Sequence, residues 1–209
     1  MPKPMFVWSG SAWVSVASEV ESLAGFATQS YADNTPGMRL IVPSSVTVGS
    51  GSGSVSTSGA VTFSGASTVS PNGCFTSAYE NYRIVFNGIT STNADLYFRL
   101  RAAASDQSGA NYAQNSSLIT TALTVSRASG QTSLRLTQNN SGTYEYVLTA
   151  DIFAPQLSSK TIVKGDGTQF FSNFLFGGSY EANYQADGFT MFPNTGTMTG
   201  NLRIYGMKN

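Results

Sequence analysis

The sequence contains no histidine and a single cysteine, Cys74, among its 209 residues. Without histidine, Ser-His-Asp triads, Cys-His pairs and histidine-ligated zinc sites are excluded. One cysteine cannot form an internal disulfide, and we interpret it as a small buried apolar side chain. Carboxylate chemistry is the main enzymatic alternative, because glycoside hydrolysis uses two Asp or Glu side chains. No spacing along the chain brings two carboxylates together, so we expect no catalytic activity.

Charged residues are also scarce. They make up 11% of the chain, whereas soluble proteins usually carry about 25%. The 11 Lys and Arg residues balance the 11 Asp and Glu residues, so the formal net charge is +0. A basic excess, which nucleic-acid binding normally requires, is therefore missing. We expect no nucleic-acid partner and no insertion into a membrane.

Long apolar runs are missing as well. No stretch approaches the ~18 apolar residues of a membrane-spanning helix, and the opening "MPKPMFVWSG" lacks the apolar run of a signal peptide. We therefore expect the chain to be made and kept in a cytoplasm until it joins a larger assembly. A surface so weakly charged resists aggregation poorly unless sheet edges are paired, which favours an oligomer.

Alternating β-strand patterns fill residues 55–209. In "NYRIVFNGI", Tyr82, Ile84 and Phe86 share one face, and turn residues separate this run from its neighbours. The later runs are "DLYFRLRA", "EYVLTADIFAP", "KTIVKG", "QFFSNFLFGG", "DGFTMF" and "NLRIYG". Strands at regular intervals without intervening helices predict an antiparallel β-sandwich or jelly roll.

The first 48 residues have a different pattern. Phe6-Val7-Trp8 and Trp13-Val14 flank the turn "SGS", which predicts a short β-hairpin. A short helix is expected over "SEVESLAGFA" (18–27), and "MRLIVP" (38–43) is typical of a strand that ends at a proline.

These N-terminal elements contain too few apolar residues to form a core. A two-stranded hairpin is only marginally stable in water, so its two tryptophan rings need a partner surface. We therefore predict that residues 1–48 are an attachment segment and that Trp8 and Trp13 make its contacts with other chains.

Between the two parts lies the Gly/Ser-rich stretch "VTVGSGSGSVSTSGAVTFSGASTVS" (46–70). Residues 49–54 carry no apolar side chain, whereas Val55, Val61 and Phe63 reappear in the remainder. This pattern predicts a flexible hinge at 49–54, followed by strands and turns that belong to the sandwich.

Three stretches resemble tail-fibre, head-fibre and minor structural proteins of tailed bacteriophages. They are the opening "FVWSGSAWVSV", the block "NGCFTSAYENYRIVFNGITSTNADLYFRLRAAASDQSGANY" (72–112) and the ending "DGFTMFPNTGTMTGNLRIYGMKN" (187–209). The resemblance implies a virion protein, assembled as a homotrimer, that docks on other virion structural proteins through its N-terminal segment. It also implies that a distal jelly roll faces the host.

Two groups of residues are candidates for binding a host-surface polysaccharide. They are Tyr97, Arg99 and Arg101 on one predicted strand, and Tyr180, Asn183 and Tyr184 in a Gly-containing stretch. Aromatic rings can stack on sugars, and Arg and Asn side chains can bond to hydroxyl or acidic groups. The alternative is structural, because the arginines can equally pair with neighbouring carboxylates and any jelly roll needs such a loop.

Several other side chains have a structural interpretation. We expect Asp151, in mid-strand, to pair with an arginine across the sheet. We assign the aromatic run Phe170, Phe171, Phe174 and Phe176 mainly to the core. The Asp/Gly stretches 105–112 and 164–170 are expected to be turns and not calcium loops, so we expect no metal and no cofactor.

The leading hypothesis is therefore a short fibre or spike protein of the virion that binds host glycans. A capsid decoration protein that binds no receptor is the alternative within the structural class. A polysaccharide-degrading tail-spike enzyme is the alternative in the enzyme class.

The N-terminal attachment hypothesis can be tested with the double variant Trp8→Ala, Trp13→Ala. Because the hairpin has no core of its own, we expect the variant to lose incorporation into particles, measured by immunoblot of purified virions. The thermal unfolding of the sandwich should not change. Incorporation at the wild-type level would place the attachment point elsewhere.

Overall fold

A computed structural model describes residues 6–8, 10–15, 37–138, 142, 144–170 and 172–208. All regular elements within these ranges are β-strands. The chain forms two compact units, 1–37 together with Asn209, and 38–208. The helix expected at 18–27 lies outside the described residues.

In the N-terminal unit, β1 (Phe6–Trp8) pairs antiparallel with β2 (Trp13–Ser15), so that Trp8 is opposite Trp13. Gly10 lies in the intervening turn with a φ of 93°, a left-handed conformation that glycine adopts without strain. The Trp8 side chain is exposed. The attachment role of this hairpin remains a prediction.

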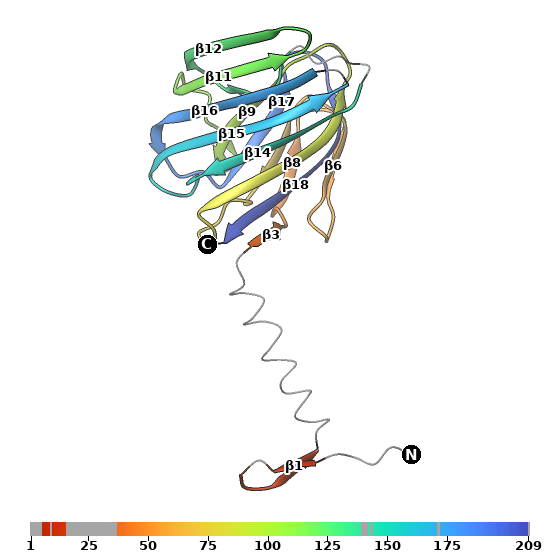
Figure 1. Cartoon of the computed structure of the whole chain (residues 1–209), viewed down its shortest axis with the longest axis vertical. Helices are drawn as coiled ribbons and strands as arrows, with labels where there is room; N and C mark the ends of the chain where they lie inside the picture. The colour runs from red at the N-terminus through yellow and green to blue at the C-terminus, as the bar shows by residue number, and fades with distance from the viewer. Residues whose placement is uncertain are drawn as a thin grey trace. The chain divides into compact units, whose positions relative to one another are not determined.

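The larger unit is an antiparallel β-sandwich with a jelly-roll-like, all-β fold (Figure 1). One sheet has the order β10-β9-β17-β7-β4, with β13 also paired to β9. Its strands are β4 (Ser45–Val48), β7 (Val69–Asn72), β9 (Leu96–Ala102), β10 (Ser105–Asp106), β13 (Leu134–Arg135) and β17 (Gly188–Pro193).

The second sheet is wider and has the order β12-β11-β16-β15-β14-β8-β18-β6-β5, with β3 also paired to β18. Its strands are β3 (Gly37–Ile41), β5 (Ser52–Val55), β6 (Val61–Ala66), β8 (Asn81–Thr90), β11 (Tyr112–Ile119), β12 (Leu123–Gln131), β14 (Tyr146–Phe153), β15 (Ser159–Gln169), β16 (Ser172–Tyr184) and β18 (Met198–Lys208). The sequence-based prediction of an antiparallel sandwich is therefore confirmed.

Aromatic side chains fill the space between the two sheets. Phe86 and Tyr146, from neighbouring strands of the ten-stranded sheet, stack with ring centroids 5.3 Å apart. Phe98 and Phe189 stack at 5.5 Å in the six-stranded sheet. Each of these rings is almost completely buried. Burying such rings contributes roughly 1.5–3 kcal/mol each, so they supply a large share of the stability of the fold.

Cys74 belongs to the same core. Its side chain is fully buried, and this burial raises the pKa of the thiol. Its interpretation as a small buried apolar residue is confirmed. Asp151 pairs with Arg83 on the adjacent strand through two bonds, of 2.6 and 2.8 Å, as the sequence predicted. This carboxylate raises the pKa of the guanidinium.

The hinge predicted at 49–54 is wrong, because hydrogen bonds join this stretch to residues 62–68 of the sandwich. The amide of Gly49 donates to the carbonyl of Thr68, and Ser50 Oγ donates to the carbonyl of Gly65. Ser52–Val55 forms strand β5 against β6. Backbone pairing and serine hydroxyl bonds replace the apolar contacts that the sequence lacks here. The compact sandwich therefore begins at residue 38 and not at 55.

The integration of this stretch can be tested at Gly51, which has a φ of 67° and whose Cβ, if present, would clash with the Ser64 carbonyl. Gly51→Ala should lower the free energy of unfolding by more than about 1 kcal/mol, measured by urea denaturation. Gly130→Ala is the matched control, because Gly130 has a φ of 65° but no atom near its Cβ position. Equal effects of the two variants would restore the hinge interpretation.

Candidate functional site

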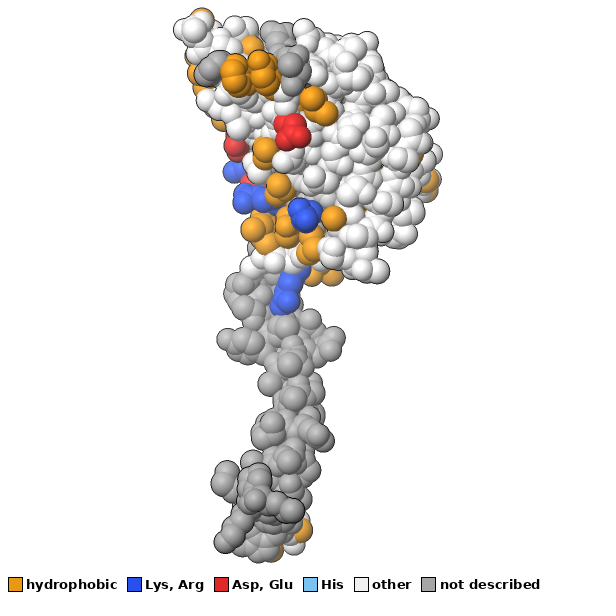
Figure 2. All heavy atoms as spheres, turned by 90° about the vertical axis from the view of Figure 1, so that its right-hand side faces the viewer, with side chains coloured by type: hydrophobic (Ala, Val, Ile, Leu, Met, Phe, Trp, Pro, Cys, Tyr) orange, Lys and Arg blue, Asp and Glu red, His pale blue; other side chains and the backbone are white. Residues whose placement is uncertain are grey.

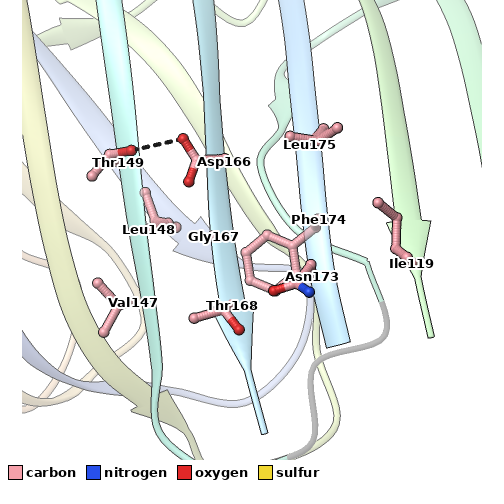
Figure 3. Close-up of a pocket in the computed structure, with 10 residues that line it drawn as sticks. All are labelled: Ile119, Val147, Leu148, Thr149, Asp166, Gly167, Thr168, Asn173, Phe174 and Leu175. Atoms are coloured by element: carbon pink, nitrogen blue, oxygen red, sulfur yellow. Dashed lines mark hydrogen bonds between the residues drawn. The ribbon is translucent and has the colours of Figure 1, made fainter. Parts of the chain in front are cut away.

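The outer face of the ten-stranded sheet has a shallow depression of about 450 Å³ over β14, β15, β16 and the end of β11 (Figure 3). Its lining residues are Ile119, Val147, Leu148, Thr149, Asp166, Gly167, Thr168, Asn173, Phe174 and Leu175. Apolar and hydrogen-bonding side chains are thus combined over neighbouring strands.

The strand register places these side chains together. Val147 pairs with Thr168, and Thr168 with Asn173, so three side chains of neighbouring strands form one row. A second row joins Thr149, Asp166 and Leu175 in the same way. Because successive side chains of a strand point to opposite faces, both rows point outward.

The floor of the depression depends on β15. Gly167 faces inward, where a Cβ would clash with the ring of Phe174 on β16. Glycine at this position lets the aromatic ring pack directly beneath the strand. The outward neighbours Asp166 and Thr168 are exposed on either side of it.

The polar groups of the depression can both accept and donate hydrogen bonds. Asp166 Oδ1 accepts a bond of 3.1 Å from the Thr149 hydroxyl. In the described part of the chain, no Lys or Arg nitrogen lies within 4.0 Å of the Asp166 carboxylate. The Asn173 amide is exposed in the adjoining row. These groups are therefore accessible to a ligand that carries hydroxyl groups.

Two stacked aromatic rings stand at the strand ends beside this depression. Tyr144 and Phe170 have ring centroids 4.3 Å apart and an interplanar angle of 2°. Their exposed fractions are 42% and 61%, which is unusual for rings of this size. Tyr144 lies three residues before Val147 and Phe170 two residues after Thr168, so the pair borders the first outward row.

Phe170 has a strained backbone, with a φ of 47°. The two-residue loop between the paired residues Gln169 and Ser172 favours a positive φ at this position, and a bulky residue adopts it only at a conformational cost. The turn is fixed from below by the buried Gln169, whose Nε2 donates a 2.7 Å bond to the Tyr144 carbonyl. The protein thus holds an apolar ring in solvent at a conformational cost.

Arg101, predicted to contact a glycan, instead serves the fold. Only 8% of the residue is exposed, and its guanidinium donates to the Asp106 carboxylate and the Ala104 carbonyl. It also bonds to Ser70, Asn72 and Thr190. Because β10 folds back over β9, the arginine is covered and its donors are engaged.

Tyr97 and Arg99 lie on the outer face of the six-stranded sheet, in a half-buried stack with Phe192. The Tyr97 and Phe192 ring centroids are 5.7 Å apart, and the Arg99 guanidinium lies 4.6 Å from the Phe192 centroid. Arg99 Nε also donates to the Thr132 carbonyl at 3.0 Å. Its Nη1 lies 3.9 Å from Asp106 Oδ2, so the structural alternative, pairing with a neighbouring carboxylate, holds for Arg99.

The second predicted group does not form a stacking loop, because it lies within strand β16. Tyr180 points inward, is buried and packs against Tyr112 at 4.9 Å. Tyr184 is half-buried and contacts Tyr180, and Asn183 is exposed. The two predicted groups also belong to different sheets, so they do not make one site.

Sequence reasoning missed the aromatic pair. Phe174 and Phe176 are buried as predicted, but Phe170 is exposed, and Phe171 lies outside the described residues. Within this aromatic run, Phe170, Phe174 and Phe176 all have even numbers, so strand periodicity alone would put Phe170 on the inner face with the other two. Only the hairpin turn after Gln169 separates it from the core.

The space-filling view adds the distribution of charge around the sandwich. Figure 2 shows a broad area with almost no charged or hydrophobic side chains, while both kinds gather along one side. The described residues contain no group of three His, Cys, Asp or Glu side chains that could hold a metal ion. No helix long and apolar enough to cross a membrane occurs in the described ranges.

No protein-family model matches the chain, and no curated protein matches it. Two solved structures show a distant likeness. A protein of unknown function from Shewanella oneidensis MR-1 has 13% sequence identity and a TM-score of 0.32, over 82% of this chain and 78% of that chain. Peanut lectin with a nine-residue peptide has 9% identity and a TM-score of 0.26, over 83% and 92%. Likeness at this level supports no conclusion about function.

The structural role of Arg101 predicts a large loss of stability for Arg101→Leu. Removing the cation leaves the Asp106 carboxylate and several buried polar groups without their partner, which should cost roughly 3 kcal/mol in urea denaturation. Lys160→Met, which removes an exposed ion pair with Glu181, is the control and should have no measurable effect. A fully stable Arg101→Leu variant would show that the arginine is available for another role.

Proposed function

We propose that this chain is a structural protein of a tailed-bacteriophage virion that binds a host-surface glycan without cleaving it. In this proposal the N-terminal unit attaches to other virion proteins, and the β-sandwich carries the glycan site on the outer face of its ten-stranded sheet. The site consists of Tyr144, Phe170 and the depression around Asp166.

The virion part of the proposal is supported by the sequence. The opening hairpin pattern, the 72–112 block and the 187–209 ending resemble fibre and minor structural proteins. The division into a short N-terminal unit and a large sandwich fits an attachment segment that joins a separate binding module. We further propose that three chains assemble through their N-terminal units, as the resemblance implies.

The single observation that carries the glycan proposal is the exposed Tyr144–Phe170 pair with its strained phenylalanine. A sugar ring has apolar C–H faces and a rim of hydroxyl groups. The aromatic pair offers a surface for the C–H face, and Val147 and Leu175 offer further apolar contacts. Asp166, Thr149 and Asn173 supply acceptors and donors for the hydroxyl groups.

Binding is favoured over a purely structural decoration role because the site keeps apolar rings in solvent at a cost. A decoration protein would need such rings only where a capsid subunit covers them. Binding is favoured over hydrolysis because the depression contains one carboxylate, Asp166, whereas the common glycosidase mechanisms need two that flank a single bond.

The proposal is tested by calorimetric titration of the protein with oligosaccharides prepared from the host surface. Phe170→Ala should weaken binding at least about tenfold, which corresponds to about 1.4 kcal/mol. Asp166→Asn should weaken it as well, because the neutral amide replaces a charged acceptor of nearly the same shape. Leu157→Ala is the control, since Leu157 is exposed in the loop between β14 and β15.

Wild-type affinity in both site variants would place the glycan site elsewhere, with the Tyr97–Phe192 stack as the next position to test. A reducing-sugar assay on the same oligosaccharides should show no release above the buffer control. Turnover would refute the binding proposal in favour of an enzyme.

A further inference from the structure

Strand β12 (Leu123–Gln131) forms one end of the ten-stranded sheet (Figure 1). It pairs with β11 along one side, and in the described part of the chain no strand pairs with its other side. The free side therefore presents a row of backbone N–H and C=O groups, in regular register with β11 from Leu123 to Ala128. Such an edge is a template for pairing with another strand.

Exposed apolar side chains adjoin this edge. Leu123 and Val125 are 65% and 64% exposed, the highest values among the exposed apolar residues of the sandwich. Leu123 pairs with the exposed Ile119, and Val125 and the exposed Leu175 both pair with Ser117. We call Ile119, Leu123, Val125 and Leu175 the β12 patch.

Between Leu123 and Ala128, β12 has few of the usual protections of an edge strand; its pairing with β11 becomes irregular only beyond Ala128. The sequence "LTVSRASGQ" has no proline, lysine or acidic residue, and Arg127 is its only charge. Its inner-face residues Thr124, Ser126 and Ala128 are exposed or half-buried, so the core does not hold this strand as it holds its neighbours. A long, unprotected edge with exposed apolar side chains indicates an interaction surface.

We propose that two copies of this chain pair through β12, antiparallel and about a twofold axis, so that the ten-stranded sheet continues from one copy into the other. When β12 of one copy pairs with β12 of another, each strand supplies the hydrogen-bond partners for the free backbone groups of the other, so no different edge is needed. The occupant of the β12 edge is therefore the same edge of another copy. This proposal is independent of the glycan site.

The side chains select the register of this pairing. With Val125 on the twofold axis, the two Val125 side chains are opposite each other and each Leu123 is opposite an Arg127. The aliphatic part of the arginine can then cover the leucine. With Arg127 on the axis, two like charges would be directly opposite, which is destabilising. The Val125 register joins both β12 patches into one apolar surface.

Pairing would also place two depressions on one continuous outer face, since Ile119 and Leu175 belong to both the patch and the depression. A host polysaccharide with repeating units can occupy both depressions, and the second contact is then intramolecular. This gain in avidity follows only if the glycan proposal is also correct.

The first test is the mass of the full-length protein by light scattering. Val125→Lys puts two like charges on the proposed axis. If three chains join through their N-terminal units and their β12 edges pair with those of a second trimer, the mass should fall from six chains to three; if β12 is the only contact, it should fall from two chains to one. Far-UV circular dichroism and the unfolding temperature should stay unchanged, because Val125 is exposed. Leu157→Lys is the matched control and should keep the wild-type mass.

The second test addresses the register and the identity of the partner. Val125→Lys mixed with Val125→Glu should restore the wild-type mass, because only pairing at the axis brings position 125 of one copy opposite position 125 of the other. Val125→Cys should give linked pairs with a short bismaleimide, whereas the wild type should not react because Cys74 is buried.

Unchanged mass in Val125→Lys, or no rescue in the mixture, would overturn the proposed pairing. Linked pairs of Val125→Cys combined with an unchanged mass of Val125→Lys would also overturn it, because the links would then come from chance collisions. If Val125→Lys keeps the wild-type mass while Phe170→Ala weakens glycan binding, the pairing is contradicted and the glycan proposal stands. The two proposals therefore fail separately.

Discussion

The packing of aromatic rings between the two sheets is the constraint on which the other features depend. Phe86, Phe98 and Phe174 point inward and are almost completely buried. Since side chains alternate along a strand, each inward ring determines which neighbours point outward. Phe174 at the core puts Asn173 and Leu175 on the outer face, and this places them beside Asp166. The site is therefore a consequence of core packing and not of a separate loop structure.

Periodicity made the sandwich predictable, because Tyr82, Ile84 and Phe86 alternate with polar residues and are all buried. It failed at 49–54, where backbone pairing and serine hydroxyl bonds hold a segment without apolar side chains. These contacts come from residues 62–68, which a local pattern does not identify as partners. The same limit explains Arg101, whose burial depends on β10 folding back over β9.

The candidate site was less predictable than the fold for a related reason. Asp166 and Phe170 come from a stretch that the sequence assigned to turns and core. Their exposure depends on the end of β15 and on the register between three strands. Tyr180 and Arg101 have residue types that suit sugar binding, but their strand positions place them under other elements. Residue type indicates what chemistry is possible, while register decides whether solvent reaches it.

Low charge and unequal sheet width together explain the behaviour expected of β12. The ten-stranded sheet is wider than the six-stranded sheet that covers it, so the last strand gains little burial from the core. On β11, Tyr112 and Leu118 are still buried, whereas on β12 Leu123 and Val125 are exposed. Charged side chains on such an edge strand would keep it hydrated and would oppose pairing with other strands. A chain in which only 11% of residues are charged has few such residues to place there, and pairing with a second copy covers the apolar side chains and satisfies the backbone in one step.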